Sequence, residues 1–96
     1  MPDKLISPAD CRSMTEVRVG VDALDAELVH LLARRFAYMR AAARIKLERA
    51  QVRDEARKAE VIANACAFAD ELGIPVPLVA DLWERLVEGS IAYEMD

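Results

Sequence analysis

The sequence has few of the residues that mark metal, redox or membrane proteins. Among its 96 residues are two cysteines, Cys11 and Cys66, whose spacing fits neither a metal site nor a redox motif. Free thiols in a reducing compartment are the simpler interpretation. The single histidine, His30, has no ligand partner and is interpreted as structural. No apolar stretch is long enough to span a membrane, and the first residues lack the apolar run of a signal peptide. These absences predict a cytoplasmic protein without a bound metal.

Positive charge and aromatic residues are also scarce. Thirteen Lys and Arg stand against 17 Asp and Glu, giving a net charge of −4. Domains that bind nucleic acid usually carry a basic excess, so the charge argues against such a partner. Aromatic residues make up 5% and glycines number three, whereas 54% of the chain is hydrophobic and rich in Ala and Leu. This composition favours an all-α fold.

The longest predicted helix begins near Ser13 and runs to about Ala50. Ser13 and Glu16 have the spacing of a capping box. At ~1.5 Å per residue such a helix spans roughly 50 Å, whereas a compact monomer of this length has a radius of gyration of about 12 to 13 Å. The helix must therefore bury its apolar face against other helices, which predicts an intertwined homodimer. The apolar face, at steps of four and three, consists of Val17, Val21, Leu24, Leu28 and Leu31.

Two shorter helices are expected after a break at residues 51–53. Asp54 suits the N-cap of a helix that ends at Leu72, and Gly73 suits its C-cap. Pro77 suits the first position of a third helix, which runs almost to the C-terminus. Residues 1–12 are then a leader, and residues 13–96 form one domain of three helices. The predicted inward residues are Val61, Ile62, Ala65, Phe68, Ala69 and Leu72, and then Leu78, Val79, Leu82, Trp83, Leu86, Val87 and Ile91.

Basic residues stand where the apolar face of the first helix should continue. The period places Arg35 on this face, and Lys46 lies only about 20° away around the helix. A cation on an inward face is costly unless an anion pairs with it. Arg18 lies ~25 Å along the axis from Arg35, so an antiparallel second chain would bring Arg18 of one copy near Arg35 of the other.

Polar residues also interrupt the apolar face of the third helix. Ser90 and Glu94 are one turn apart and follow the apolar residues of the same face. Asp54 and Arg57, in the first turn of the second helix, would complete a polar pocket. Together with the cations, these residues predict a site for a small anionic ligand.

Each of these polar residues also has an ordinary interpretation. Arg35 can be a solvated surface charge, and Arg57 can pair with Asp54 or Glu60. Ser90 can donate to the carbonyl four residues earlier, and Glu94 near a C-terminus can be solvated. The periodicity alone leaves both interpretations open.

These residues match a known pattern over nearly the whole chain. The chain resembles the all-helical class of chorismate mutases and, within it, the isochorismate pyruvate lyases. The motifs that carry the resemblance are Glu16-Val17-Arg18, Val21-Asp22, Leu24-Asp25, Leu31-Leu32, Arg34-Arg35, Ala42-Ala43-x-x-Lys46, Val52-Arg53-Asp54-x-x-Arg57 and the helix from Leu82-Trp83 to Ser90.

The resemblance implies an intertwined homodimer of three-helix chains with two active sites and no cofactor. Arg35, together with Arg18 of the other chain, would bind the two carboxylates of the substrate, a task that suits the bidentate guanidinium. Lys46 would donate to the ether oxygen.

The resemblance also assigns residues of the second and third helices. Asp54 and Arg57 would line the site and hold the ring hydroxyl, and Ser90 would support the ring. The chain departs from the family at two positions. Glu94 stands where many bacterial members have glutamine, and Lys58 stands where the family usually has glutamate.

The implied reaction is the rearrangement of chorismate to prephenate, which needs no nucleophile, metal or cofactor. The runner-up is isochorismate pyruvate lyase, which forms salicylate. The leader motif Pro8-Ala9-Asp10-Cys11 is similar to the lyase branch, whereas Glu94 and Asp54 favour the mutase. Residues 47–56 are expected to form a lid. A third interpretation, of a different class, is a non-catalytic helical dimerisation module whose inward charges are interchain ion pairs.

Overall fold

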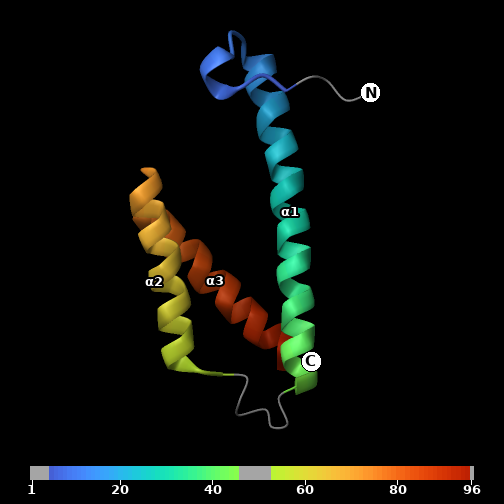
Figure 1. The fold of residues 1–96 in the computed structure, drawn as a ribbon, viewed down its shortest axis with the longest axis vertical. Helices are drawn as coiled ribbons and strands as arrows, with labels where there is room; N and C mark the ends of the chain where they lie inside the picture. Colours follow the sequence, from blue (N-terminus) through green and yellow to red (C-terminus); the bar gives the residue numbers. More distant parts are fainter. Residues whose placement is uncertain (1–4, 46–52, 96) are drawn as a thin grey trace. The chain divides into compact units, whose positions relative to one another are not determined.

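The structure is a computed structural model that describes residues 5–45 and 53–95. Within these residues it contains helices and no strands (Figure 1), which confirms the all-α prediction. The elements are η1 (Pro8–Asp10), α1 (Met14–Ile45), α2 (Glu55–Leu72) and α3 (Val76–Met95). The chain divides into two units, Met1–Phe36 and Ala37–Asp96.

α1 is one continuous helix of 32 residues that begins where the sequence predicts. The amide of Glu16 donates to Oγ of Ser13 at 3.2 Å, and the Glu16 carboxylate accepts from the amide of Arg12 at 2.7 Å. The carboxylate therefore reaches one residue further back than in the expected capping box. The last part of the predicted helix, residues 46–50, lies outside the described residues.

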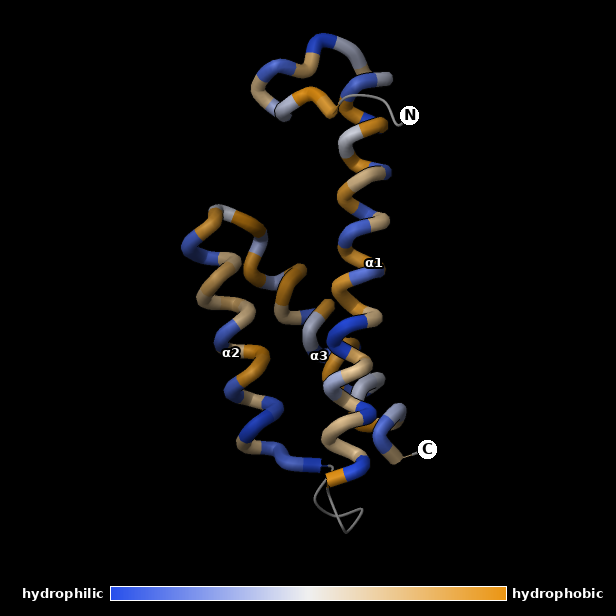
Figure 2. The backbone as a smooth tube through the Cα atoms, turned by 45° about the vertical axis from the view of Figure 1, so that its right-hand side comes forward, coloured by the Kyte–Doolittle hydropathy of each residue, from blue (hydrophilic) through white to orange (hydrophobic). Residues whose placement is uncertain are grey.

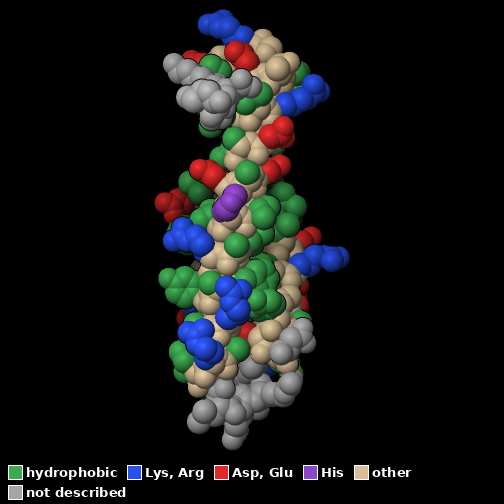
Figure 3. Space-filling model, turned by 90° about the vertical axis from the view of Figure 1, so that its right-hand side faces the viewer, with side chains coloured by type: hydrophobic (Ala, Val, Ile, Leu, Met, Phe, Trp, Pro, Cys, Tyr) green, Lys and Arg blue, Asp and Glu red, His purple; other side chains and the backbone are tan. Residues whose placement is uncertain are grey.

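The apolar face of α1 is exposed in the single chain. No residue of α1 is buried, and Val21, Leu24 and Leu28 are 48%, 57% and 57% exposed. Figure 2 shows hydrophobic positions recurring along this helix, and the face in Figure 3 shows their side chains at the surface between charged ones. Exposed apolar area of this extent is typical of a surface that binds another protein.

The leader packs on the first turns of α1 within the unit Met1–Phe36. Oγ of Ser7 donates to Oδ2 of Asp10 at 2.9 Å, and the Cys11 amide donates to the Pro8 carbonyl at 3.3 Å. Leader and helix enclose an apolar groove of about 490 Å³. Its lining includes Leu5, Ile6 and Pro8 from the leader and Val17, Val21 and Leu24 from α1.

α2 is capped at both ends as predicted. Oδ1 of Asp54 accepts a hydrogen bond from the amide of Arg57 at 3.0 Å. At the other end Gly73 has a φ of 74°, and its amide donates to the Asp70 carbonyl while that of Ile74 donates to Ala69. This is a Schellman motif, in which glycine adopts the left-handed conformation without a steric penalty.

α3 begins one residue earlier than predicted. Its first residue is Val76, so Pro77 is the second helical residue and not the first. A proline is tolerated anywhere in the first turn, because amides there have no partner within the helix, and its sequence position therefore locates the start only approximately.

The core lies between α2 and α3, which run side by side after a short turn (Figure 1). One cluster contains Ala65, Ala69 and Val79, with Val76 and Trp83 packed against it. The small alanine side chains allow close approach of the two helices. A second cluster consists of Val87 and Ile91 with Val61 and Ile62.

Four residues predicted to face inward are exposed in the single chain. Phe68 and Leu72 of α2 are 65% and 71% exposed, and Leu78 and Leu82 of α3 are 53% and 51% exposed. The periodicity correctly places them on apolar faces, but the hairpin buries only the part of each face where α2 and α3 meet. Their position on apolar faces agrees with the prediction, and their burial by a second chain stays a prediction.

Candidate active site

The two arginines predicted to bind carboxylates both lie on α1. Arg18 is exposed and makes no ion pair within the described part of the chain. Arg35 is partly buried. Both belong to one continuous helix, so the rise per residue separates them by roughly 25 Å. One chain therefore cannot bring both guanidinium groups to the same small ligand.

Lys46 lies outside the described residues, as does most of the predicted lid at residues 47–56. Of that segment, the structure describes residues 53–56. The role of Lys46 stays a prediction.

Asp54 and Arg57 lie together at the start of α2. The Asp54 carboxylate caps the helix, and the Arg57 guanidinium pairs with Glu60 one turn further on. This pair is the ordinary alternative that the sequence left open. The side chains of Arg57 and Glu60 are 63% and 60% exposed. Exposed ion pairs contribute little stability, so an anionic ligand can replace Glu60 at little cost.

Ser90 and Glu94 lie one turn apart on α3, as expected. Ser90 is 4% exposed, and its Oγ donates to the Leu86 carbonyl at 2.7 Å. The bond to the carbonyl four residues earlier is thus observed. Glu94 is partly buried in the last turns of the helix.

Next to Glu94 on α3, Tyr93 joins α3 to the C-terminal part of α1. Nη1 of Arg40 donates to its phenolic oxygen at 2.7 Å.

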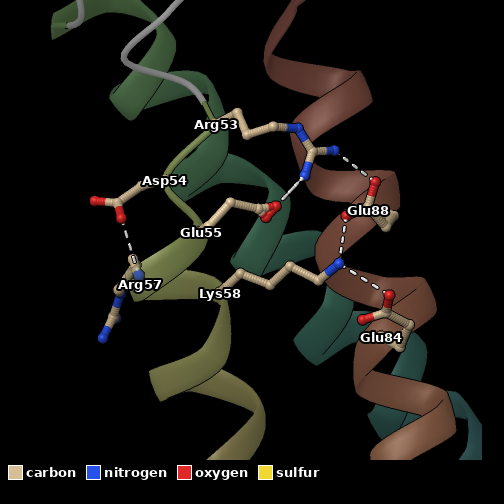
Figure 4. A network of polar contacts seen from close by, with 7 residues as sticks. All are labelled: Arg53, Asp54, Glu55, Arg57, Lys58, Glu84 and Glu88. Carbon is tan, nitrogen blue, oxygen red and sulfur yellow. Dashed lines mark hydrogen bonds and ion pairs between the residues drawn. The ribbon is translucent and has the colours of Figure 1, made fainter.

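The structure shows an ion-pair network between α2 and α3 that the sequence analysis did not predict (Figure 4). Nζ of Lys58 lies 2.9 Å from Oε1 of Glu84 and 2.7 Å from Oε2 of Glu88. The other oxygen of Glu88 lies 2.6 Å from Nη2 of Arg53. The hydrogen bonds from Arg53 and then Lys58 lower the pKa of Glu88 from 4.5 to about 2. The spacing of Glu84 and Glu88, one helical turn apart, was the available signal.

Among the residues that the structure describes, no group of three or more His, Cys, Asp or Glu side chains is arranged to hold a metal ion. Within the same residues, no helix is both long and apolar enough to cross a membrane.

The sequence profile of the family described as chorismate mutase type II matches residues 17–95. The chain belongs to this family. The chorismate mutase type II match confirms the resemblance and indicates an enzyme of chorismate metabolism. The matched range includes all the predicted site residues, namely Arg18, Arg35, Lys46, Asp54, Arg57, Ser90 and Glu94.

Among proteins of assigned function, the chain is similar to an isochorismate pyruvate lyase of Pseudomonas aeruginosa. The two are 29% identical over 89 residues, which cover 93% of this chain and 88% of the lyase. The profile thus assigns the chain to the chorismate mutase type II family, and this similar protein is named for the lyase reaction on isochorismate.

Proposed function

We propose that the protein is a chorismate mutase, which rearranges chorismate to prephenate in aromatic amino acid biosynthesis in the cytoplasm. The observation that carries this proposal is the family match over residues 17–95. The matched range includes the cations Arg18, Arg35, Lys46 and Arg57, to which the resemblance assigns the site. Asp54, at the start of α2, favours the mutase over the lyase.

The active form in this proposal is an intertwined homodimer with two shared sites. Two observations support it. The apolar face of α1 is exposed along the single chain, and a second copy would remove this area from water. Arg18 and Arg35 lie on one helix about 25 Å apart by the helical rise, so a dicarboxylate needs Arg18 from the second chain.

The proposed chemistry is a unimolecular shift in which the ether carbon–oxygen bond breaks while a carbon–carbon bond forms. Arg35 and the partner's Arg18 hold the two carboxylates, so the enolpyruvyl arm stays over the ring and the entropy of finding that conformer is lost on binding. Negative charge grows on the ether oxygen in the transition state. Lys46 donates to this oxygen from one side, and Glu94 donates from the other when it is protonated.

The remaining residues hold the ring. Asp54 and Arg57 contact the ring hydroxyl, and Ser90 supports the ring side. The carboxylate of Asp54 already accepts one hydrogen bond from the amide of Arg57 and has a second oxygen for the substrate. The guanidinium of Arg57 exchanges the exposed carboxylate of Glu60 for the substrate.

A second candidate function is isochorismate pyruvate lyase, which eliminates pyruvate from isochorismate and leaves salicylate. The similarity to the Pseudomonas aeruginosa lyase over 93% of the chain favours it, as does the leader motif at residues 8–11. The same cations would bind the two carboxylates of isochorismate.

The test supplies chorismate and isochorismate separately to the purified protein and measures prephenate and salicylate. Prephenate formation that is lost in Arg35→Ala, but kept in the neighbouring control Arg34→Ala, supports the mutase. Salicylate alone would replace the proposal by the lyase. Turnover of neither substrate would favour the non-catalytic dimerisation module.

A further inference from the structure

The start of α2 is held to α3 by charge and not by apolar packing. Residues 53–57 are all exposed, and the first apolar residue of α2 that packs on the core is Val61, near Val87 and Ile91. Within the described residues, the ion pairs of Arg53 and Lys58 connect the first turn of α2 to α3.

Glu88 is the centre of these contacts. Each of its two carboxylate oxygens binds a different cation, Arg53 at 2.6 Å and Lys58 at 2.7 Å. Arg53 precedes the N-cap and Lys58 follows one turn later. The Glu88 carboxylate therefore binds one cation before the first turn of α2 and one at its end. The side chain of Lys58 is only 18% exposed, which shows that it lies along the surface of α3.

The contacts of Arg53 and Lys58 with α3 also set the directions in which the adjacent residues Asp54 and Arg57 extend. Figure 4 shows Lys58 extending toward α3, whereas Arg57 extends away from it. Successive residues of an α-helix are about 100° apart, so a contact that fixes Lys58 also fixes the direction of Arg57. Asp54 follows Arg53 directly, and the Arg53 guanidinium is further held by Glu55 at 2.8 Å.

We propose that Glu88 is a positioning residue of the active site. Through Arg53 and Lys58 it fixes the position and rotation of the first turn of α2. This turn sets the direction in which Asp54 and Arg57 face the substrate. The inference rests on the proposed function, and it assigns a role to Lys58, one of the two residues at which this chain departs from the expected family pattern.

The test compares Glu88→Gln with Glu84→Gln. Glu84 lies on the same face one turn earlier and contacts Lys58 at 2.9 Å, but Lys58 keeps Glu88 when Glu84 is replaced. We expect Glu88→Gln to raise KM for the substrate at least about fivefold, with a smaller change in kcat, because misplacement of binding groups weakens both substrate and transition state. Glu84→Gln should stay within about twofold, as for an exposed pair.

Two further measurements separate positioning from a merely structural role. The conservative variant Glu88→Asp keeps the charge, and its KM should lie between those of the wild type and Glu88→Gln. The Arg57 amide, which donates to Asp54 in the wild type, should exchange its hydrogen faster in Glu88→Gln, whereas amides of Ala65 and Ala69 in the core keep their protection.

A KM within twofold of the wild type in Glu88→Gln, or an equal rise in Glu84→Gln, would overturn the positioning role. If the wild type converts neither chorismate nor isochorismate, the proposed function fails. The exchange rate of the Arg57 amide then tests separately whether Glu88 anchors the first turn of α2. Faster exchange in Glu88→Gln supports the anchoring by Glu88, and unchanged exchange overturns it.

Discussion

Lys58 and Glu88, 30 residues apart in the chain, are joined by a hydrogen bond of 2.7 Å between Nζ and Oε2. This contact directs Lys58, which stands where the resemblance predicts a glutamate, toward α3. The departure at position 58 therefore exchanges a residue expected at the substrate for one that ties two helices together. The same carboxylate, held by Arg53 as well, has measurable consequences for stability.

The free energy of unfolding should depend on pH through Glu88. Its pKa is lowered from 4.5 to about 2 in the folded state, so its contribution is complete above pH 4.5 and is lost as the pH falls through 2. Urea unfolding at a series of pH values should show the wild type more stable than Glu88→Gln at pH 7. The difference should shrink between pH 4.5 and 2. Parallel curves for the two proteins would show that the ion pairs do not contribute.

The turn between α2 and α3 depends on Gly73. Gly73→Ala should lower the free energy of unfolding by about 1 to 2 kcal/mol, because alanine at a φ of 74° meets the left-handed penalty. Gly89 lies within α3, and a methyl group there would meet no neighbouring atom within 4 Å, so Gly89→Ala should be neutral or stabilise by up to ~1 kcal/mol. Thermal or urea unfolding of both variants measures the two changes, and a loss of stability of equal size in both would contradict the assignment.

Lys46 should carry transition-state stabilisation. Lys46→Ala is expected to lose roughly 3 to 4 kcal/mol, by analogy with the loss of an oxyanion donor, and this loss should appear mainly in kcat. Arg44→Ala, which removes an exposed cation two residues earlier, serves as the control and should keep near-normal turnover. Steady-state kinetics on chorismate decides, and normal turnover in Lys46→Ala would show that the wrong lysine was assigned.

Glu94 should contribute a hydrogen bond to the ether oxygen. Glu94→Gln keeps a donor of the same length and should retain activity, whereas Glu94→Ala removes the donor and should lower kcat. The measurement is kcat on chorismate for both variants and the wild type. An unchanged kcat in Glu94→Ala would remove Glu94 from the mechanism.

The helices could be predicted from the sequence because local interactions determine their ends. Ser13, Asp54 and Gly73 act as caps in the structure as predicted, and the hydrogen bonds that define them span a few residues. Burial was harder to predict. Periodicity identifies the apolar side of a helix, but it does not tell which partner covers it. Phe68 and Leu72 lie on the apolar side of α2 and are exposed in the single chain.

For the candidate site, the sequence supplies the residues but not the contacts between distant elements. Arg18, Arg35 and Arg57 were chosen from their order in the sequence and lie within the range that the family profile matches, and their roles stay predictions. The bond between Arg53 and Glu88 is not a sequence pattern, because the two residues are 35 positions apart and meet only after α2 and α3 have packed. Contacts of this kind depend on the tertiary fold.

The most direct test of the central claim, that each site takes Arg18 from one chain and Arg35 from the other, is complementation between two inactive variants. Arg18→Ala and Arg35→Ala should each lose at least about a hundredfold in kcat/KM, because each variant leaves one carboxylate of the bound substrate buried without its arginine. When the two are unfolded together and refolded as an equal mixture, half of the dimers are mixed and each has one intact site. The mixture should therefore recover about a quarter of wild-type activity. Arg35→Ala mixed with the double variant, which can form no intact site, should recover none. Activity of the first mixture that stays at the level of the single variants would contradict shared sites.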